Sequence, residues 1–178
     1  MCYHKDLANA STYILLNSSN APGSASSVWN GTDPTSTVFS VGVDSESNGD
    51  GDDMIAYCFT SVDGYSKLGS YEGNGTTDNA FVYCGFRPKF VLFRNTSTHG
   101  GDWMLLDTSR RPNGPAGGTL VANAYNAEDG YYTSSQVNFD FLSNGFKIRH
   151  NGSPGGDSGR TYIYLAIAEN PFKQARAY

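Results

Sequence analysis

Short runs of alternating apolar and polar residues recur along the chain, whereas no stretch keeps the spacing of three to four residues that is typical of an amphipathic helix. The runs are rich in β-branched and aromatic residues, and clusters of Gly, Asn, Ser and Pro separate them, as in strands joined by tight turns. We therefore predict an all-β chain with strands at Thr12–Asn17, Thr37–Val43, Met54–Thr60, Lys67–Tyr71, Ala80–Cys84, Lys89–Arg94, Trp103–Asp107, Thr119–Asn123, Gln136–Phe141, Phe146–His150 and Arg160–Ala168.

Turn sequences between these strands favour hairpins. The clearest is Asn144-Gly145, between the apolar segments Phe139–Leu142 and Phe146–Ile148, because an Asn-Gly link accepts the positive φ of a two-residue hairpin turn. Many short strands with such turns indicate an antiparallel β-sandwich of the jelly-roll or lectin-like type.

The sequence also repeats itself at an offset of about 106 to 108 residues. Three blocks recur in the same order: Asn17–Ala21 with Asn123–Ala127, Phe39–Val41 with Phe146–Ile148, and Asn48–Tyr57 with the glycine-rich loop that leads into Arg160–Ala166. We interpret the chain as one and a half repeats: a partial first unit at 1–59, a complete second unit at 60–172 that packs with the first, and a tail at 173–178. Either the chain is a fragment of a longer fibre, or a neighbouring chain supplies the missing strands of the first unit.

Charge and composition narrow the class of protein. Charged residues make up 16% of the chain and the formal net charge is −5, with basic residues clustered only at Arg110-Arg111 and near the C-terminus. A nucleic-acid partner is therefore not expected, because phosphate binding needs a basic surface. No apolar run approaches the ~18 residues of a membrane span and the first residues do not resemble a signal peptide, so we expect a soluble chain without membrane insertion.

The three cysteines, Cys2, Cys58 and Cys84, have no Cys-x-x-Cys spacing, which argues against a zinc site and against a disulfide framework. Cys58 and Cys84 lie in apolar runs, where cysteine behaves as a small buried residue. We expect free thiols, with a Cys58–Cys84 disulfide as the alternative.

Several longer blocks are specific enough to compare with known families, namely Gly64–Gly75, Phe81–Leu92, Phe141–Lys147, Tyr162–Lys173, Tyr3–Leu7 and Trp29–Thr35. The first four resemble the start and the end of a repeated β domain in marine and freshwater phage (cyanophage) proteins that are described as tail fibres or as uncharacterised. The last two resemble a preceding copy of that domain, whose usual N-terminal part is missing here. The resemblance implies a virion-associated β domain near the end of an appendage, with no established catalytic residues.

One motif matches an enzyme signature. Gly156–Gly159 has the Gly-Asp-Ser-Gly sequence that surrounds the nucleophile of chymotrypsin-like serine proteases. Such an enzyme also needs a histidine general base, and none of His4, His99 and His150 stands in a suitable sequence setting. We interpret the motif as a turn, expect the three histidines to be exposed, and predict no catalytic residues and no cofactor.

Acidic residues form two weak candidate sites. The first is a calcium candidate made of alternating oxygen-bearing residues, namely Asp44, Glu46, Asn48 and Asp50. It lacks the closing bidentate acid of an EF-hand loop, because the twelfth position is Ile55. The second consists of Glu128, Asp129 and Asp140, which could supply the carboxylate pair of a glycoside hydrolase, although nothing in the sequence fixes their separation.

Aromatic residues beside amides favour sugar binding more than catalysis. Sugar C–H faces stack on aromatic rings while amide and carboxylate groups take the hydroxyl hydrogen bonds. The candidate glycan contacts are Trp29, Asn30, Tyr125, Asn126, Tyr131 and Tyr132. The alternative is that these rings belong to the core.

Our leading hypothesis is a structural and adhesive domain of a phage virion appendage that contacts a host-surface polysaccharide. We expect it to form homo-oligomers, to contact other virion proteins, and to reside in the extracellular virion. The alternative is a purely structural capsid-decoration or filament-forming subunit that is completed by strand pairing in trans. A polysaccharide depolymerase is the third candidate.

Overall fold

The computed structural model describes residues 1–97, 100–110, 119–128 and 137–171. Its elements, in chain order, are β1 (Thr12–Tyr13), β2 (Gly23–Ser24), α1 (Ser26–Trp29), α2 (Ser45–Asn48), β3 (Ser66–Glu72), β4 (Phe81–Tyr83), β5 (Pro88–Asn95), β6 (Met104–Asp107), β7 (Leu120–Val121), β8 (Phe139–Leu142), β9 (Gly145–Ile148) and β10 (Thr161–Ala168). The predicted all-β class and the antiparallel sandwich are confirmed.

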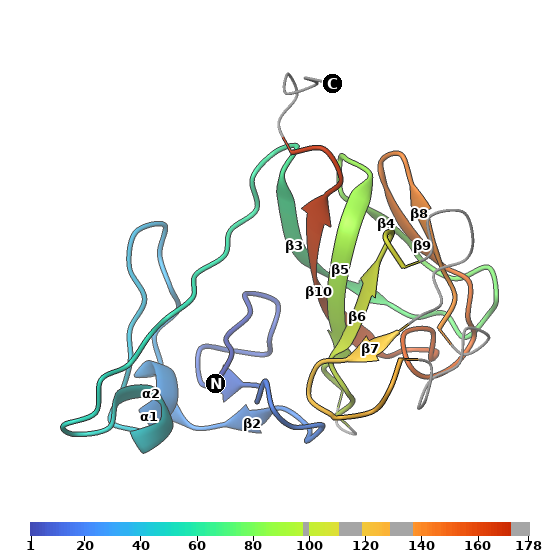
Figure 1. The fold of residues 1–178 in the computed structure, drawn as a ribbon. Helices are drawn as coiled ribbons and strands as arrows, with labels where there is room; N and C mark the ends of the chain where they lie inside the picture. Colours follow the sequence, from blue (N-terminus) through green and yellow to red (C-terminus); the bar gives the residue numbers. More distant parts are fainter. Residues whose placement is uncertain (98–99, 111–118, 129–136, 172–178) are drawn as a thin grey trace.

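Two antiparallel sheets face each other and form the sandwich (Figure 1). The larger sheet has the strand order β3-β10-β5-β6-β7, and the smaller sheet has the order β4-β9-β8. In the larger sheet β10 pairs with β3 from Thr161↔Glu72 to Ile167↔Ser66, and β5 pairs with its other edge. Because β10 has partners on both edges and is packed on both faces, its sequence is almost continuously apolar.

The space between the sheets is filled mainly by aromatic rings. Phe93 of β5 stacks on Phe139 of β8 across the two sheets with 4.9 Å between ring centroids, and within the larger sheet Tyr71 of β3 stacks on Tyr162 of β10 at 5.1 Å. Phe146 of β9 meets the rings of the larger sheet edge-on. Each such pair contributes about 0.5–1.5 kcal/mol beyond the burial of its apolar area. Contacts between the two sheets therefore stabilise the sandwich directly.

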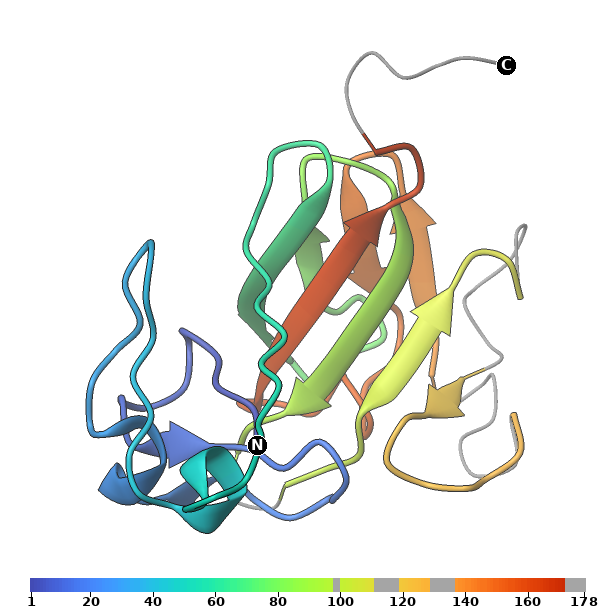
Figure 2. The same cartoon turned by 60° about the vertical axis from the view of Figure 1, so that its left-hand side comes forward.

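Residues 1–24 cover part of the outer face of the larger sheet. Figure 2 views this sheet more nearly face-on and shows the segment at its lower end. Ile14 packs there against Trp103 and Ile163, which point away from the main core. Arg94 is fully buried beneath the segment, where its Nη1 donates a hydrogen bond to the Leu15 carbonyl at 2.6 Å and its Nη2 donates to a second carbonyl of the segment.

Two predicted strands, Thr37–Val43 and Met54–Thr60, are wrong. Neither stretch is a strand in the structure, and residues 53–59 run as an extended chain that approaches β3 only at its end, where the Thr60 carbonyl accepts a hydrogen bond from the Ser66 hydroxyl at 2.7 Å (Figure 1). The physical reason is that no strand of the described structure runs beside either stretch to accept and donate backbone hydrogen bonds. Cys58 is exposed in consequence, which corrects its predicted burial.

The other predictions in this part of the chain are corrected in detail. The strand at Thr12–Asn17 shortens to β1, and the elements β2, α1 and α2 are not anticipated by the apolar pattern. His4 is buried rather than exposed, because it belongs to the segment that covers the larger sheet and its side chain faces Tyr164 of β10. The three cysteines are free thiols, as predicted, and the alternative Cys58–Cys84 disulfide does not form.

The predicted strands from Lys67 onward all have a counterpart in the structure. The hairpin between β8 and β9 is also confirmed, but its turn residues are Ser143 and Asn144, since Leu142 pairs with Gly145. Gly145 therefore belongs to the strand and does not have a positive φ. A glycine is needed there because a Cβ atom would lie 2.0 Å from the Val82 carbonyl oxygen of the neighbouring strand.

Candidate functional site

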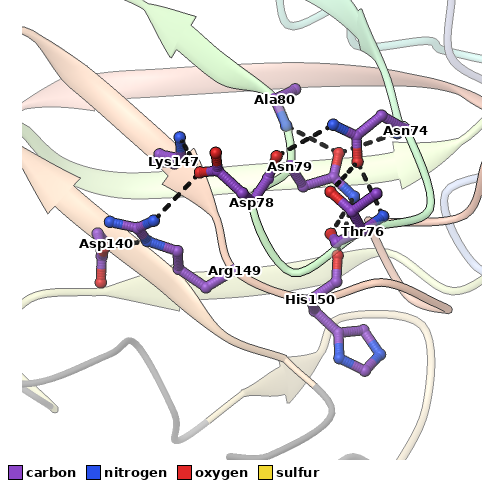
Figure 3. A network of polar contacts seen from close by, with 9 residues as sticks. All are labelled: Asn74, Thr76, Asp78, Asn79, Ala80, Asp140, Lys147, Arg149 and His150. Carbon is purple, nitrogen blue, oxygen red and sulfur yellow. Dashed lines mark hydrogen bonds and ion pairs between the residues drawn. The ribbon is translucent and has the colours of Figure 1, made fainter.

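A buried asparagine organises the loops at one end of the smaller sheet (Figure 3). Asn79 is almost fully buried, and its Oδ1 accepts hydrogen bonds from the backbone amides of Asn74 at 3.0 Å and Ala80 at 2.8 Å. Its Nδ2 donates to the carbonyls of His150 at 2.9 Å and Gly156 at 2.8 Å. One side chain thus joins the β3–β4 loop to the glycine-rich loop before β10, and it fixes the start of β4.

A row of charged side chains begins next to this asparagine (Figure 3). Asp78 lies 2.5 Å from Lys147 Nζ and 3.4 Å from Arg149 Nη1, and Arg149 Nε donates to Asp140 at 2.6 Å. Strand register explains the row, because Phe81 is paired with Lys147 and Lys147 with Asp140. Directly paired residues in a sheet project from the same face. The charges therefore lie on the outer face of the smaller sheet.

Electrostatic contacts in the row favour the charged forms of Asp78 and Arg149. The Lys147 ammonium lowers the pKa of Asp78 through a hydrogen bond and through its charge, and the hydrogen bond with Asp140 raises the pKa of Arg149. A general acid in glycoside hydrolysis needs the opposite, a carboxyl pKa raised toward neutrality. The arrangement of Asp78 with its two basic neighbours is thus suited to hydrogen bonding and not to proton donation.

Two aromatic rings stand beside the charged row. Phe81 and Tyr83 are 45% and 63% exposed, whereas Val82 between them is buried in the core. Residues two apart on a strand share a face and lie about 7 Å from each other. We call the six residues of this surface the β4 face, namely Asp78, Phe81, Tyr83, Asp140, Lys147 and Arg149.

The β4 face is absent from the sites predicted from sequence. Phe81 and Tyr83 fall inside an apolar run, and such a run suggests a strand buried on both faces. One signal does point to the exposed face: the two rings alternate with Val82 and Cys84, which both point into the core. A strand of an outer antiparallel sheet with such alternation has one buried face and one face turned toward solvent.

The hollow that Tyr125 lines includes neither Trp29 nor Asn30, so the described glycan candidates do not share this site. Tyr125 is fully exposed and lines an open hollow of about 640 Å³ together with Asn17, Glu46 and Asn123, but Asn126 does not line it. Trp29 is half-buried at the end of α1, where its ring meets the Tyr3 ring edge-on at 6.1 Å, and Asn30 follows it in the left-handed region with φ 54°. Tyr131 and Tyr132 lie outside the described residues.

The residues of the calcium candidate have structural partners or lie on an open surface. Asp44 caps α2 by accepting a hydrogen bond from the Glu46 amide at 3.0 Å, and the Asn48 amide group donates to the Gly42 carbonyl at 2.9 Å. Asp50 is exposed after α2. In the parts of the chain that the structure describes, no three His, Cys, Asp or Glu side chains are grouped so that they could hold a metal ion.

The structure also shows where most of the residues considered for catalysis lie. The Asp157 carboxylate accepts a hydrogen bond from the Tyr162 hydroxyl at 2.8 Å, and Ser158 and Gly159 form an exposed turn, as predicted for the Gly-Asp-Ser-Gly motif. Of the three acids considered for hydrolysis, Asp140 is paired with Arg149, Glu128 is exposed, and Asp129 lies outside the described residues. His99 is likewise outside them.

Comparison with known proteins places the chain in a family. A family profile that describes a domain of unknown function, DUF7483, matches residues 1–171. The chain belongs to the DUF7483 family. No curated protein and no solved structure is significantly similar to this DUF7483 chain. The match includes both the covering segment and the sandwich. Within the described part of the DUF7483 chain, no helix is long and apolar enough to cross a membrane.

Proposed function

We propose that this DUF7483 chain is a non-catalytic structural and adhesive domain of a phage virion appendage, and that it contacts a host-surface glycan through the β4 face. The virion setting is supported by the resemblance of blocks such as Gly64–Gly75 and Phe81–Leu92 to phage appendage proteins. The glycan contact is carried by one observation: two exposed rings, Phe81 and Tyr83, lie beside a row of paired charges on the same sheet face.

The chemistry of this face matches that of a sugar. The rings of Phe81 and Tyr83 offer apolar surfaces for sugar C–H faces, and the Tyr83 hydroxyl adds a polar group at the edge. Lys147 and Arg149 donate hydrogen bonds, while the two carboxylates of the row accept them. Because salt bridges already hold these side chains in position, little conformational entropy is lost when a ligand binds.

The test is a glycan array combined with a host-cell binding assay, with the chain displayed on multivalent beads. We expect binding by the native chain and its loss in the Phe81→Ala/Tyr83→Ala double variant, because the stacking surface is removed. The matched control is Tyr125→Ala, which removes a fully exposed ring at the other candidate site and should bind normally.

Other outcomes would contradict the proposal. If Tyr125→Ala abolished binding and the double variant bound normally, the glycan site would be the hollow beside Tyr125 and not the β4 face. Failure of the native chain to bind any glycan or host cell at any multivalent presentation would refute adhesion altogether. Release of new reducing ends from bound polysaccharide would show that the protein is an enzyme, and we expect none.

A further inference from the structure

Residues 38–62 expose an unusual amount of apolar surface. Nine large apolar side chains of this stretch are solvent-exposed, and Ile55 and Tyr57 reach 81% and 82%. Each of the nine residues keeps more than a third of its surface exposed, and five of them keep more than 60%. A stretch with so many exposed apolar side chains is typical of an interaction surface.

The backbone of the same stretch is also without partners. Among the residues that the structure describes, the amides and carbonyls of residues 53–59 make no hydrogen bond. The chain is nevertheless extended there (Figures 1 and 2). An extended apolar segment with free backbone groups has the properties of an unpaired strand, which readily adds to other strands.

The sequence of this segment identifies the partner. At an offset of 108 residues, Met54–Thr60 aligns with Tyr162–Ala168 of β10, so that Ile55 corresponds to Ile163. In β10 the side chains that correspond to Met54, Ala56 and Cys58 lie in the sandwich core, and β3 and β5 pair with its two edges. Residues 54–60 thus have the pattern of a central strand and require strands like β3 and β5.

The chain's own β3 and β5 cannot fill this role, because β10 already occupies the position between them. We infer that residues 54–60 form the central strand of a second sandwich, and that another DUF7483 unit donates the flanking strand pair, with sequences like those of β3 and β5. The segment would then gain antiparallel partners on both edges, as in donor-strand complementation. This inference goes beyond the proposed glycan binding and is independent of it.

Cys58 provides a local readout in the native chain. It is exposed now, but its counterpart in β10 is Ala166, which is fully buried. Strand completion should therefore bury the Cys58 thiol and slow its alkylation. The other two cysteines are internal references, since Cys2 is half-buried and Cys84 is buried.

The experiment adds two synthetic peptides, with the sequences of residues 64–75 and 86–96, to the full chain. Alkylation at each cysteine is then followed by peptide-mapping mass spectrometry. We expect the alkylation rate of Cys58 to fall at least about tenfold as the peptides saturate the segment, because a buried thiol is inaccessible to the reagent. Scrambled peptides of the same composition should have no effect.

A matched pair of proline variants tests the strand itself. Ala56→Pro removes a backbone N–H from the middle of the segment, and it should abolish protection by the peptides. Ala127→Pro makes the same change in an exposed stretch outside the segment and should preserve protection. Both positions are exposed and irregular in the free chain, so neither variant should impair folding of the sandwich.

Three results would overturn the inference. The first is unchanged alkylation of Cys58 at saturating peptide, and the second is equal protection in Ala56→Pro. The third is protection of Cys58 that increases with the concentration of the chain and not with that of the peptides, together with dimers in sedimentation velocity. That last result would mean that residues 54–60 pair with the same segment of a second copy. Glycan binding by the β4 face is measured separately, so failure of one proposal is distinguishable from failure of the other.

Discussion

Replacing Arg94 with methionine should loosen residues 1–24 from the larger sheet. The guanidinium donates hydrogen bonds to the carbonyls of Leu15 and Asn20, and it lies 5.4 Å from the centroid of the Trp103 ring. Burial lowers the pKa of Arg94, but an arginine stays protonated in a protein, so a full charge is held beneath the segment.

The expected change in the free energy of unfolding is the balance between the interactions that the guanidinium makes and the cost of burying its charge. Hydrogen bonds from a charged donor are worth about 1.5–3 kcal/mol each, and a cation–π contact about 0.5–2 kcal/mol. Against this stands the desolvation of the guanidinium, which costs several kcal/mol and is aggravated because its Nε has no partner. Methionine keeps the length of the side chain, and the Leu15 carbonyl still accepts from Trp103 Nε1. We therefore expect the free energy of unfolding to fall by about 1–3 kcal/mol.

Denaturant unfolding followed by tryptophan fluorescence measures this change, and native-state hydrogen exchange locates it. Exchange should accelerate in residues 1–24 and remain slow in β10. Arg160→Met is the control, because Arg160 is partly exposed and its guanidinium lies 3.8 Å from the Asp157 carboxylate. A loss of stability with unchanged exchange in residues 1–24 would refute the assigned role of Arg94.

Three further predictions concern the sandwich. Asn79→Ala should lower the free energy of unfolding by about 2–4 kcal/mol, since it removes the side-chain partner of the Ala80 amide and of the His150 carbonyl. Denaturant titration measures this change, and Asp78→Asn, the control, should have little effect. Gly145→Ala should lower the free energy of unfolding by about 1–3 kcal/mol, because the added Cβ would collide with the β4 backbone. Denaturant titration measures this as well, and an unchanged unfolding midpoint would contradict the close contact. Burial raises the pKa of Cys84 to about 12, above the ordinary value of a thiol, so its neutral form is favoured in the folded state. The corresponding stability is present below pH 9 and is lost as the pH rises from 9 toward 12; unfolding titrations should show this loss, and Cys84→Ala should reduce it.

The sequence predicts the sandwich well because local and tertiary demands coincide there. The strand predicted at Arg160–Ala168 differs from β10 by one residue, and that predicted at Lys89–Arg94 lies within β5. In these strands the alternation of side chains agrees with the two faces that the sheets bury. Turn residues between them are also of the expected types.

The same reasoning fails at Met54–Thr60 for a physical reason. Apolar pattern and β-propensity describe the faces that a strand would bury, but they do not report whether a neighbouring strand is present to pair with it. The pattern of this segment is as strong as that of β10, and only the hydrogen-bond partners differ. Apolar pattern and β-propensity are therefore not sufficient to predict a strand where the described structure supplies no partner.

The candidate site was harder to predict because exposure is decided by tertiary packing. Trp29 has a polar neighbour, Asn30, yet its ring packs against Tyr3 and its Nε1 is buried without a hydrogen-bond partner. Phe81 and Tyr83 lie in an apolar run, yet they face solvent because they project from the outer face of the smaller sheet. The neighbouring residues in the sequence therefore do not predict which of these rings is packed and which faces solvent.

The positions of the two proposed contacts lead to a last prediction. The β4 face belongs to the smaller sheet, whereas residues 54–60 lie beyond the covered face of the larger sheet (Figure 1). Strand completion should therefore leave the β4 face open, and units joined in this way would display several copies of it. Linked sites raise avidity by about 10²–10⁴-fold without a change at any single site.

Where another DUF7483 unit donates its strands and joins several chains, Ala56→Pro should accordingly weaken their binding to a dense glycan surface, while binding of a single chain to a soluble oligosaccharide stays the same. Surface plasmon resonance on dense and sparse glycan surfaces measures the first quantity, and isothermal titration with the soluble sugar measures the second. The Phe81→Ala/Tyr83→Ala variant should lose both. If Ala56→Pro also lost binding to the soluble sugar, the segment and the β4 face would form one site, and the separation of assembly from adhesion would be wrong.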